Sequence, residues 1–501
     1  MKMIFVKTII LATSILFTAC QTSKNSSTNT TDTRIPETEA ANYVIKINVS
    51  NQQFSYIYPW LKRSPYKSYG RGVFIGPNMI LAPSRILQYA KYIELEDYKS
   101  EKKFEARIKY IDYSANLAIL EAVDSSNVSA YQSIKLADKL ALKESVNIYQ
   151  FEANGDALIT EGKMQKATLG YYPDNRLLVY LINVTLPGRS RLYGTPVLNE
   201  KNQLSGLASS YNSDTEILTL VPSPVIQHFL NDCDDATYDG FPKIGFGYSR
   251  VDSQLRDYLS LPESEDGLYL SFIRKRSPAD NAGLKVGDVI LKIDDYNIDK
   301  KFDYIDPDYG KLEIGHLIST RSKKGDKRLL EIWRNKKKIT VTVVMDVIKK
   351  SDFSIIPNEY EKSPQYINTG GLVFLELSRP FLQSWKNWRT RAPQRLVNLE
   401  RNQWELFDKS QKIIILGSMV DNKSLVGYRS FRYNWLRKLN NKEINSLQDI
   451  ELALKKPVDG KFHVYEFEYT PKKLVLDKES LKQANEAMLL KYRLPALKNL
   501  N

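Results

Sequence analysis

Short apolar or alternating runs, separated by turn residues, recur through the first half of the chain. Residues 43–49, 72–75, 79–81 and 177–182 are examples. Runs of this kind, rich in Val, Ile, Leu, Tyr and Phe, predict β-strands, and several of them in close succession favour a β-sandwich or β-barrel. The pattern therefore predicts a mainly β domain over residues 42–238.

The pattern changes after residue 238, where one helix signal stands between strand signals. Ser277 precedes Pro278 and an apolar segment that ends at Gly283. Serine is a favoured N-cap, proline is favoured at the first helical position, and glycine often follows a helix end. With strand-like runs at 267–273 and 289–294, this predicts an α+β domain over residues 239–347.

The last third repeats the mixture of strands and helices. A polar linker over residues 348–364 leads into a glycine-containing strand at 366–378 and a buried strand at 412–417. A turn and helix follow at 436–450, and the tail from Lys478 has helical spacing. We therefore expect a second α+β domain over residues 365–501.

Length and composition agree with several domains rather than one. The chain has 501 residues, of which 42% are hydrophobic, and domains usually hold about 100–200 residues. The 72 Lys and Arg exceed the 58 Asp and Glu, for a net charge of +14. This favours anionic partners such as lipid headgroups. The sequence shows no metal-ligand cluster, no glycine-rich phosphate loop and no nucleic-acid motif, so we expect no metal, no cofactor and no nucleic acid.

The first 19 residues have the pattern of an export signal. Lys2 and Lys7 come before an apolar stretch over residues 8–17, which is too short to span a bilayer, and small residues lead to Cys20. Cysteine after Thr-Ala resembles a bacterial lipobox, which implies lipidation of Cys20 and a lipid-anchored place in the bacterial cell envelope. An ordinary cleaved signal with an incidental Cys20 is the alternative. Residues 20–41, rich in Ser, Thr and Asn, predict a flexible tether.

Cysteine usage adds one expectation. With Cys20 lipidated, Cys233 has no partner for an intrachain disulfide. We expect Cys233 to behave as a small buried hydrophobic residue.

Four segments of the first domain resemble the Deg/HtrA serine proteases. The resemblance implies a trypsin-like double β-barrel followed by a PDZ domain and a second PDZ-like domain. The matching segments are the entry strands at 59–82, the aspartate loop and strand at 112–120, the strand after the nucleophile at 194–199, and the closing helix at 221–230.

The resemblance also places the three catalytic positions, and all three have changed. Arg85 stands where the histidine base belongs, Asn116 where the aspartate belongs, and Tyr193 where the serine nucleophile belongs. An arginine stays protonated and cannot accept the serine proton, and an asparagine has no charge to stabilise an imidazolium. The chain has three histidines. His228 lies on the closing helix, where we expect it to pack, and His316 and His463 fall in the later domains. The sequence therefore predicts an inactive protease homologue.

Ser190 supports an alternative interpretation. Residues 187–190 match the front of the family's nucleophile loop if three residues are inserted after Ser190. A serine endopeptidase with a base other than histidine would then remain open. Arg-Leu rather than Gly-Gly follows Ser190, which argues against the tight turn that builds an oxyanion hole.

The second domain resembles a PDZ domain through residues 282–290. In that family an apolar-Gly-apolar loop binds a peptide carboxylate, which implies peptide binding at Lys243, Ile244, Gly245 and Phe246. Residues 311–319 are the expected groove helix. These residues can also serve packing alone, with the groove filled by another part of the chain.

Residues 365–501 resemble the second PDZ-like domain of longer Deg proteases. Trp385, Trp388 and Trp404 stand among Arg and Asn in its 380–408 segment, which suits either a partner surface or packing on an adjacent domain. The sequence predicts an envelope pseudoprotease that binds peptides or unfolded envelope proteins as a holdase, adaptor or scaffold. A purely structural or host-contact protein with a blocked groove is a further hypothesis. Related proteases form trimers, so the resemblance implies a homotrimer, while the residues themselves leave the assembly open.

Overall fold

The computed structural model describes residues 34–152, 156–172, 175–187, 192–233, 238–406, 411–491, 494 and 496–500. The predicted signal segment, Cys20 and most of the tether lie outside these residues, as does Ser190. Within the described part, no helix is both long and apolar enough to cross a bilayer.

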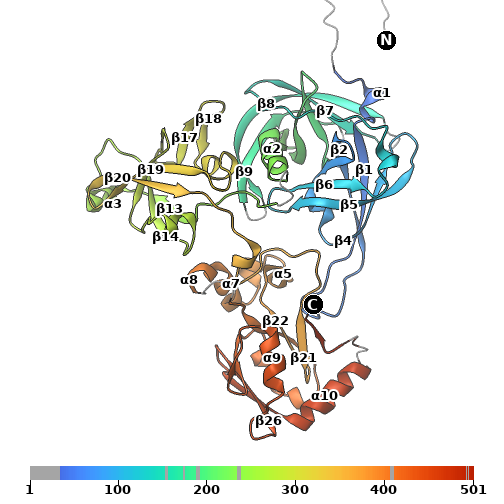
Figure 1. The fold of residues 1–501 in the computed structure, drawn as a ribbon, viewed down its shortest axis with the longest axis vertical. Helices are drawn as coiled ribbons and strands as arrows, with labels where there is room; N and C mark the ends of the chain where they lie inside the picture. Colours follow the sequence, from blue (N-terminus) through green and yellow to red (C-terminus); the bar gives the residue numbers. More distant parts are fainter. Residues whose placement is uncertain are drawn as a thin grey trace, which may run out of the picture.

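Two closed β-barrels form the first domain, as the strand pattern predicted (Figure 1). Each barrel is a six-stranded antiparallel sheet closed on itself, and α2 (Ser223–Asp232) follows the second one. The first barrel consists of β1 (Val44–Asn51), β2 (Tyr66–Gly76), β3 (Met79–Ala82), β4 (Ala90–Glu96), β5 (Lys103–Asp112) and β6 (Leu117–Ala122). The second consists of β7 (Ser145–Phe151), β8 (Ala157–Tyr172), β9 (Asn175–Asn183), β10 (Pro196–Asn199), β11 (Leu204–Asn212) and β12 (Ile217–Pro222).

A buried arginine joins the two barrels. Arg71 on β2 is 8% exposed, and its guanidinium donates to the Tyr98 hydroxyl at 3.2 Å, to Thr195 Oγ1 at 3.2 Å and to the Phe151 carbonyl at 3.0 Å. Phe151 and Thr195 belong to the second barrel, so these bonds cross the interface. A buried charge is tolerated when its donors are satisfied, and here that requirement fixes how the barrels meet.

The second domain is a six-stranded antiparallel sheet with short helices, consistent with a PDZ fold. The predicted helix after Ser277 is α4 (Pro278–Asn281), and the Ser277 side chain accepts from the Asp280 N–H as its N-cap. The sheet contains β13 (Phe246–Arg250), β14 (Leu268–Ile273), β15 (Val289–Ile293), β16 (Tyr296–Asn297), β19 (Lys327–Arg334) and β20 (Lys337–Val344), with α3 (Ser253–Leu259) between β13 and β14.

The helix expected over residues 311–319 is wrong. The segment instead completes a hairpin of β17 (Asp303–Asp306) and β18 (Gly310–Glu313), and then makes one π-helical turn at His316–Thr320. The hairpin and the turn contact β8 and β9 of the second barrel. Non-local packing on the barrel therefore replaces the local helix.

The third domain has two four-stranded sheets, with a helical segment inserted into the first. One sheet has the order β23 (Ile414–Met419), β22 (Leu372–Glu376), β21 (Tyr366–Thr369), β28 (Lys498–Asn499). The other has the order β25 (Lys442–Glu443), β24 (Leu436–Leu439), β26 (Phe462–Phe467), β27 (Lys473–Asp477). The helices are α5 (Arg379–Leu382), α6 (Trp388–Arg391), α7 (Gln394–Arg401), α8 (Gln403–Leu406), α9 (Leu447–Leu454) and α10 (Lys478–Lys491).

A loop of the first barrel holds this third domain. The connection between β1 and β2 runs towards the lower part of Figure 1, where the Trp60 ring lies 5.8 Å from that of Tyr366. Ser418 donates its hydroxyl to the Ile57 carbonyl at 2.6 Å, and the Tyr56 hydroxyl donates to the Glu359 carbonyl at 3.0 Å. The third domain is thus attached to the first by packing as well as by the linker.

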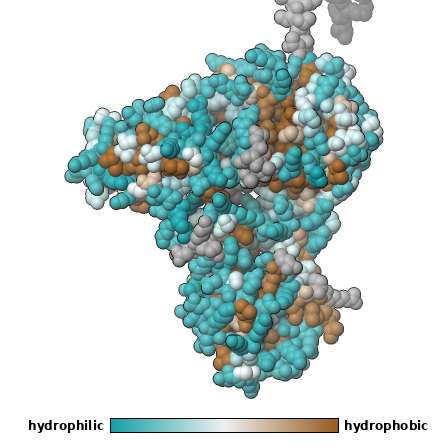
Figure 2. All heavy atoms as spheres, viewed as in Figure 1, coloured by the Kyte–Doolittle hydropathy of each residue, from teal (hydrophilic) through white to brown (hydrophobic). Residues whose placement is uncertain are grey.

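The visible surface is largely polar. Most of the face drawn in Figure 2 is hydrophilic, and apolar residues gather mainly over the two-barrel domain and along the PDZ sheet. Cys233 is buried, as expected from its sequence context.

Candidate functional site: a changed catalytic centre and two PDZ grooves

The three changed catalytic positions lie together at the junction of the barrels. Arg85 belongs to a short 3-10 turn after β3, Asn116 to the β5–β6 connection, and Tyr193 to the turn before β10. Asn116 Oδ1 accepts from the Arg85 backbone N–H at 3.0 Å. The Arg85 guanidinium carbon lies 5.7 Å from the centre of the Tyr193 ring, a cation–π contact. The three residues that the family resemblance singled out are therefore neighbours in the fold.

Local backbone geometry preserves the frame of the nucleophile turn. Gly194 has φ +80°, and a Cβ on it would lie 2.1 Å from the Arg71 carbonyl oxygen. The same β2 residue donates its N–H to the Tyr193 carbonyl at 3.0 Å. Only glycine fits such a close backbone approach at positive φ, so Gly194 fixes the backbone of the turn that carries Tyr193.

None of the three histidines reaches this centre. His228 on α2 stacks on Phe241 with ring centres 4.2 Å apart, and His463 Nδ1 lies 2.9 Å from Asn440 Nδ2 in the third domain. His316 is buried in the PDZ domain with Tyr304 and Asp306. The three positions that the resemblance assigns to the triad thus hold a guanidinium, an amide and a phenol, none of which is a base near neutral pH.

A cleft of about 840 Å³ opens at this centre. Its walls come from both barrels, from the 348–364 linker through Tyr360, and from the third domain through Gln383. Arg85 is the one charged side chain among the described lining residues, and the others are mostly hydroxyls and amides. Six tyrosines contribute: Tyr66, Tyr89, Tyr113, Tyr171, Tyr172 and Tyr360.

Asp112, the first residue of the 112–120 segment that resembles the family's aspartate loop, does not line the cleft. It is 8% exposed, accepts from the Tyr238 hydroxyl, and accepts the Ser114 N–H at 2.6 Å. Burial raises the pKa of Asp112, against these hydrogen bonds and the nearby Lys243. Asp112 therefore belongs to the contact between the first domain and the PDZ domain.

The predicted peptide loop has two inward and two outward residues. Ile244 is 4% exposed and packs in the core, while burial and the neighbouring Arg274 lower the pKa of Lys243 to about 8. Gly245 has φ +84° and Phe246, which begins the edge strand β13, is half-buried. The structure therefore leaves Gly245 and Phe246 beside the sheet edge and places Lys243 and Ile244 at the domain contact.

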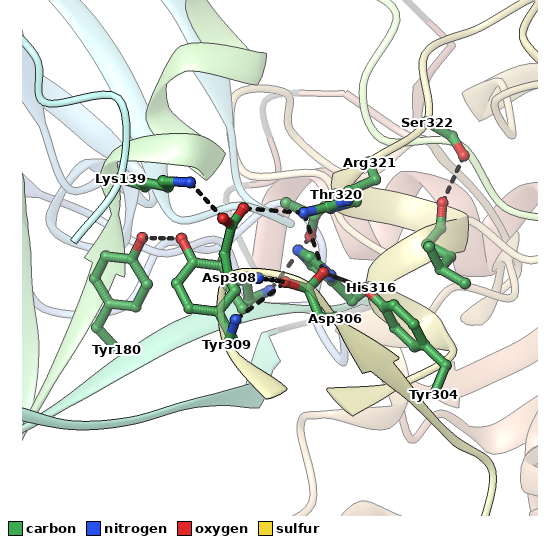
Figure 3. A network of polar contacts seen from close by, with 12 residues as sticks. Lys139, Tyr180, Tyr304, Asp306, Asp308, Tyr309, His316, Thr320, Arg321 and Ser322 are labelled. Atoms are coloured by element: carbon green, nitrogen blue, oxygen red, sulfur yellow. Dashed lines mark hydrogen bonds and ion pairs between the residues drawn. The ribbon is translucent and has the colours of Figure 1, made fainter. Parts of the chain in front are cut away.

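Residues 303–322, which include the segment expected to form the groove helix, are fixed to the second barrel (Figure 3). Tyr309 and Tyr180 share a hydroxyl hydrogen bond of 2.5 Å, and Lys139 pairs with Asp308. Asp306 accepts from Tyr304 at 2.7 Å and from the Asp308 N–H at 2.9 Å. Burial would raise the pKa of Asp306, but hydrogen bonds from His316 and Tyr304 outweigh it and lower the pKa. The PDZ domain is thus anchored through residues 303–322.

The corresponding edge of the third domain is already occupied. β28, near the end of the chain, pairs antiparallel with β21, and Lys498 Nζ reaches Glu451 Oε1 on α9 at 2.6 Å. A strand beside the first strand of a PDZ sheet is where a peptide is added. The groove-filling alternative raised for the first PDZ domain is therefore seen in the second.

Comparison with known proteins identifies two PDZ domains and several similar proteases. Two family models described as PDZ domain match residues 242–345 and 355–499. The Arabidopsis thaliana chloroplastic protease Do-like 2 is 24% identical over 92% of this chain and 76% of its own length. The mitochondrial putative protease Do-like 12 from the same plant is 21% identical over 90% of this chain and 85% of its own length.

The chain has two PDZ domains and is similar over most of its length to Deg/HtrA proteases. Among solved structures, it is similar to the HtrA-type protease AlgW with a decapeptide, at 16% identity and TM-score 0.46 over 62% of this chain and 97% of AlgW. It is also similar to the serine endoprotease from Yersinia pestis, at 15% identity and TM-score 0.42 over 63% of this chain and 100% of the other.

The tyrosines that line the cleft were missed from the sequence. The cleft's tyrosines are spread from Tyr66 to Tyr360, and no spacing in the chain connects them. The three tryptophans lie in or beside the helical segment: Trp385 packs edge-on to Phe381 and Trp404 to Phe353, while Arg389 lies over Trp388. Arg274 of the PDZ domain lies 4.8 Å from the centre of the Trp404 ring, so Trp404 also contacts that neighbouring domain.

Proposed function

We propose that this protein is a pseudoprotease of Deg/HtrA type that binds peptides or unfolded proteins without cleaving them, as a holdase, adaptor or scaffold. One observation carries the proposal: Arg85, Asn116 and Tyr193 occupy the catalytic centre as a connected cluster. The cation–π contact and the amide hydrogen bond hold the three changed residues against one another. A triad that acts as a unit loses on the order of 10⁶ in turnover when its members are lost.

Peptide binding is assigned to the first PDZ domain. β13 is an edge strand, and Gly245 with Phe246 lies at its start. Backbone N–H groups at such a loop can hold a peptide's terminal carboxylate while the peptide pairs with the edge strand. The second PDZ domain has its edge covered by β28, so the first is the better candidate.

Location is part of the proposal and rests on the sequence. A basic, apolar and small-residue leader ending at Cys20 supports export and lipid anchoring at the bacterial cell envelope. Mass spectrometry of the mature N-terminus tests this: a diacylated or triacylated Cys20 supports anchoring, and an unmodified N-terminus contradicts it.

Cleavage is tested with unfolded casein and the purified chain. We expect no cleavage by the natural chain, and none by Tyr193→Ser, because the base and the acid remain missing. The relatives are named as proteases, so the assay also runs with Ser190→Ala. Cleavage by the natural chain that disappears in Ser190→Ala would replace the proposal with an active endopeptidase.

Peptide binding is tested by fluorescence anisotropy with a C-terminal peptide library. Each peptide is compared with its C-terminally amidated form, which lacks the carboxylate. We expect binding by free-acid peptides and at least about tenfold weaker binding by the amides. Equal binding of both forms would contradict carboxylate recognition by the PDZ loop.

A further inference from the structure

We infer that the former catalytic cleft is a binding site for an acidic, extended polypeptide segment, with Arg85 pairing a carboxylate at the position of the lost base. The inference rests on the proposed absence of cleavage, because a bound segment must survive there. It adds a second ligand site to the PDZ loop and assigns the chemistry of its ligand.

Charge selects the class of ligand. Arg85 is exposed and is the single charged side chain among the described residues that line the cleft. No ion pair joins it to a carboxylate in the described part of the chain; its guanidinium rests on the Tyr193 ring instead. A planar guanidinium held in this way presents its donors to a carboxylate in a fixed fork.

The immediate surroundings of the cleft do not cancel this charge. Arg63 lies close enough to Tyr89 to oppose the rise in that tyrosine's pKa, and Glu361 lies close enough to Tyr113 to raise its pKa. These two charges are of opposite sign, and neither lines the cleft. Arg85 therefore determines the charge preference inside it.

The walls have the composition of a protein-binding surface. Tyrosine rings supply large rigid contact areas at low entropic cost, and Ser, Asn and Gln supply adaptable hydrogen bonds. The ring of Tyr360 is 5.0 Å from that of Tyr89 and 4.5 Å from that of Tyr113. Tyr360 comes from the linker before the third domain, so the aromatic wall is built from two separate parts of the chain.

Strand pairing favours a polypeptide over a glycan. Ser209 and Ser210 of β11 line the cleft. β11 pairs with β12 as far as Asn212, but its pairing with β10 ends at Leu207. Beyond that point no strand of the described residues pairs with its other edge, so an extended segment can add there through main-chain hydrogen bonds.

The test uses labelled peptides of about nine residues, with blocked N-termini and amidated C-termini. They are identical except for a central Glu, Gln or Lys, and amidation removes the carboxylate that the PDZ loop would bind. Anisotropy is measured at low salt, because screening weakens such contacts. We expect the Glu peptide to bind about tenfold more tightly than the Gln peptide, and the Lys peptide to bind most weakly.

Substitution of Arg85 locates the effect. Arg85→Gln should remove the preference for Glu, and Arg85→Lys should keep part of it. Arg107→Gln is the matched control, since Arg107 pairs with Glu121 on the outside of the same barrel and does not line the cleft. Equal affinity for Glu and Gln peptides, or a Glu preference that survives Arg85→Gln, overturns the inference.

Three further outcomes separate the related proposals. An acidic oligosaccharide such as tetragalacturonate that binds through Arg85 while the Glu peptide does not would assign the cleft to glycans, against the inference. Cleavage of the peptides would overturn the proposed function itself. Binding of free-acid peptides to the PDZ loop with no Glu preference in the cleft would overturn the inference alone.

Discussion

At the residue scale, the loop glycine of the first PDZ domain can be compared with a second glycine that serves as its control. Gly245 and Gly283 both have positive φ, +84° and +75°. A Cβ on Gly245 would lie 2.2 Å from Ser277 Cβ, whereas a Cβ on Gly283 would meet no heavy atom within 4 Å. An alanine would strain the backbone at both positions, but only at Gly245 would its Cβ also clash with a neighbouring side chain.

We therefore expect unequal losses of stability. Gly283→Ala should cost about 1 kcal/mol, the ordinary cost of placing alanine in the left-handed region. Gly245→Ala should cost about 3 kcal/mol, because it also displaces the N-cap of α4. Native-state hydrogen exchange of the β14 amides measures both. Equal losses would mean that the close contact with Ser277 relaxes without cost.

Lys243 gives a prediction about pH. Its folded pKa of about 8 lies below the ordinary 10.5 because of burial and Arg274. Between these values the unfolded chain binds more protons than the folded chain, so stability rises with pH across that window. Asp112 titrates next to Lys243, and the comparison is therefore made in an Asp112→Asn background.

In that background, the chain with Lys243 should gain stability relative to Lys243→Met between pH 7 and pH 10. The gain should be at least about 1 kcal/mol, measured by urea unfolding monitored at each pH. Buried tyrosines titrate equally in both variants and cancel in the difference. A difference that stays flat with pH would show that the lysine is solvated in the folded state.

At the scale of elements, local signals were read correctly and non-local ones were not. The alternating run at residues 43–49 predicted strand β1, and Ser277-Pro278 predicted α4, because both depend on neighbouring residues alone. Residues 311–319 failed because the barrel determines their conformation: a Cβ on Gly315 would lie 2.6 Å from Leu169 Cδ1. The Tyr-rich cleft was missed for the same reason, because its tyrosines meet only in the folded chain. Arg85, Asn116 and Tyr193 were found because the residues on either side of each still match the family's motifs.

β28 is the element whose removal is most informative. The Asn368 N–H donates to the Leu497 carbonyl at 2.7 Å, and the Tyr366 hydroxyl donates to the Ala496 carbonyl at 3.0 Å. A chain ending at residue 495 loses these partners and exposes the edge of β21. We expect the Asn368 amide to exchange at least about tenfold faster, as measured by hydrogen–deuterium exchange.

Lys498→Ala is the control for this truncation. It removes the exposed pair with Glu451 but leaves the strand, and such pairs contribute about 0–1 kcal/mol. Exchange at Asn368 should therefore change little. Equal protection in the truncated chain would mean that β28 adds nothing to the edge of β21.

At the scale of the whole molecule, the third domain completes the cleft only while it stays docked. Tyr360 and Gln383 line the cleft from the linker and from this domain. The docking contact is the β1–β2 loop, whose Trp60 packs on the buried cluster of Val373, Val420, Met488 and Leu494. Two domains of one chain are expected to separate when the main apolar contacts between them are removed.

Trp60→Ala combined with Tyr56→Ala should therefore release the third domain while leaving it folded. Each change removes a packed aromatic ring, at a cost of about 3–5 kcal/mol of contact energy, because Tyr56 packs in the cluster around Leu375 and Phe381 just as Trp60 packs on Val373. Small-angle X-ray scattering should show a larger radius of gyration, and the Glu peptide should bind several-fold more weakly because Tyr360 is no longer held in the cleft wall. Tyr428→Ala is the matched control, since its ring packs within the third domain beside Phe431. If the radius of gyration rises but peptide affinity is unchanged, the linker alone positions Tyr360, and the third domain has no part in the cleft.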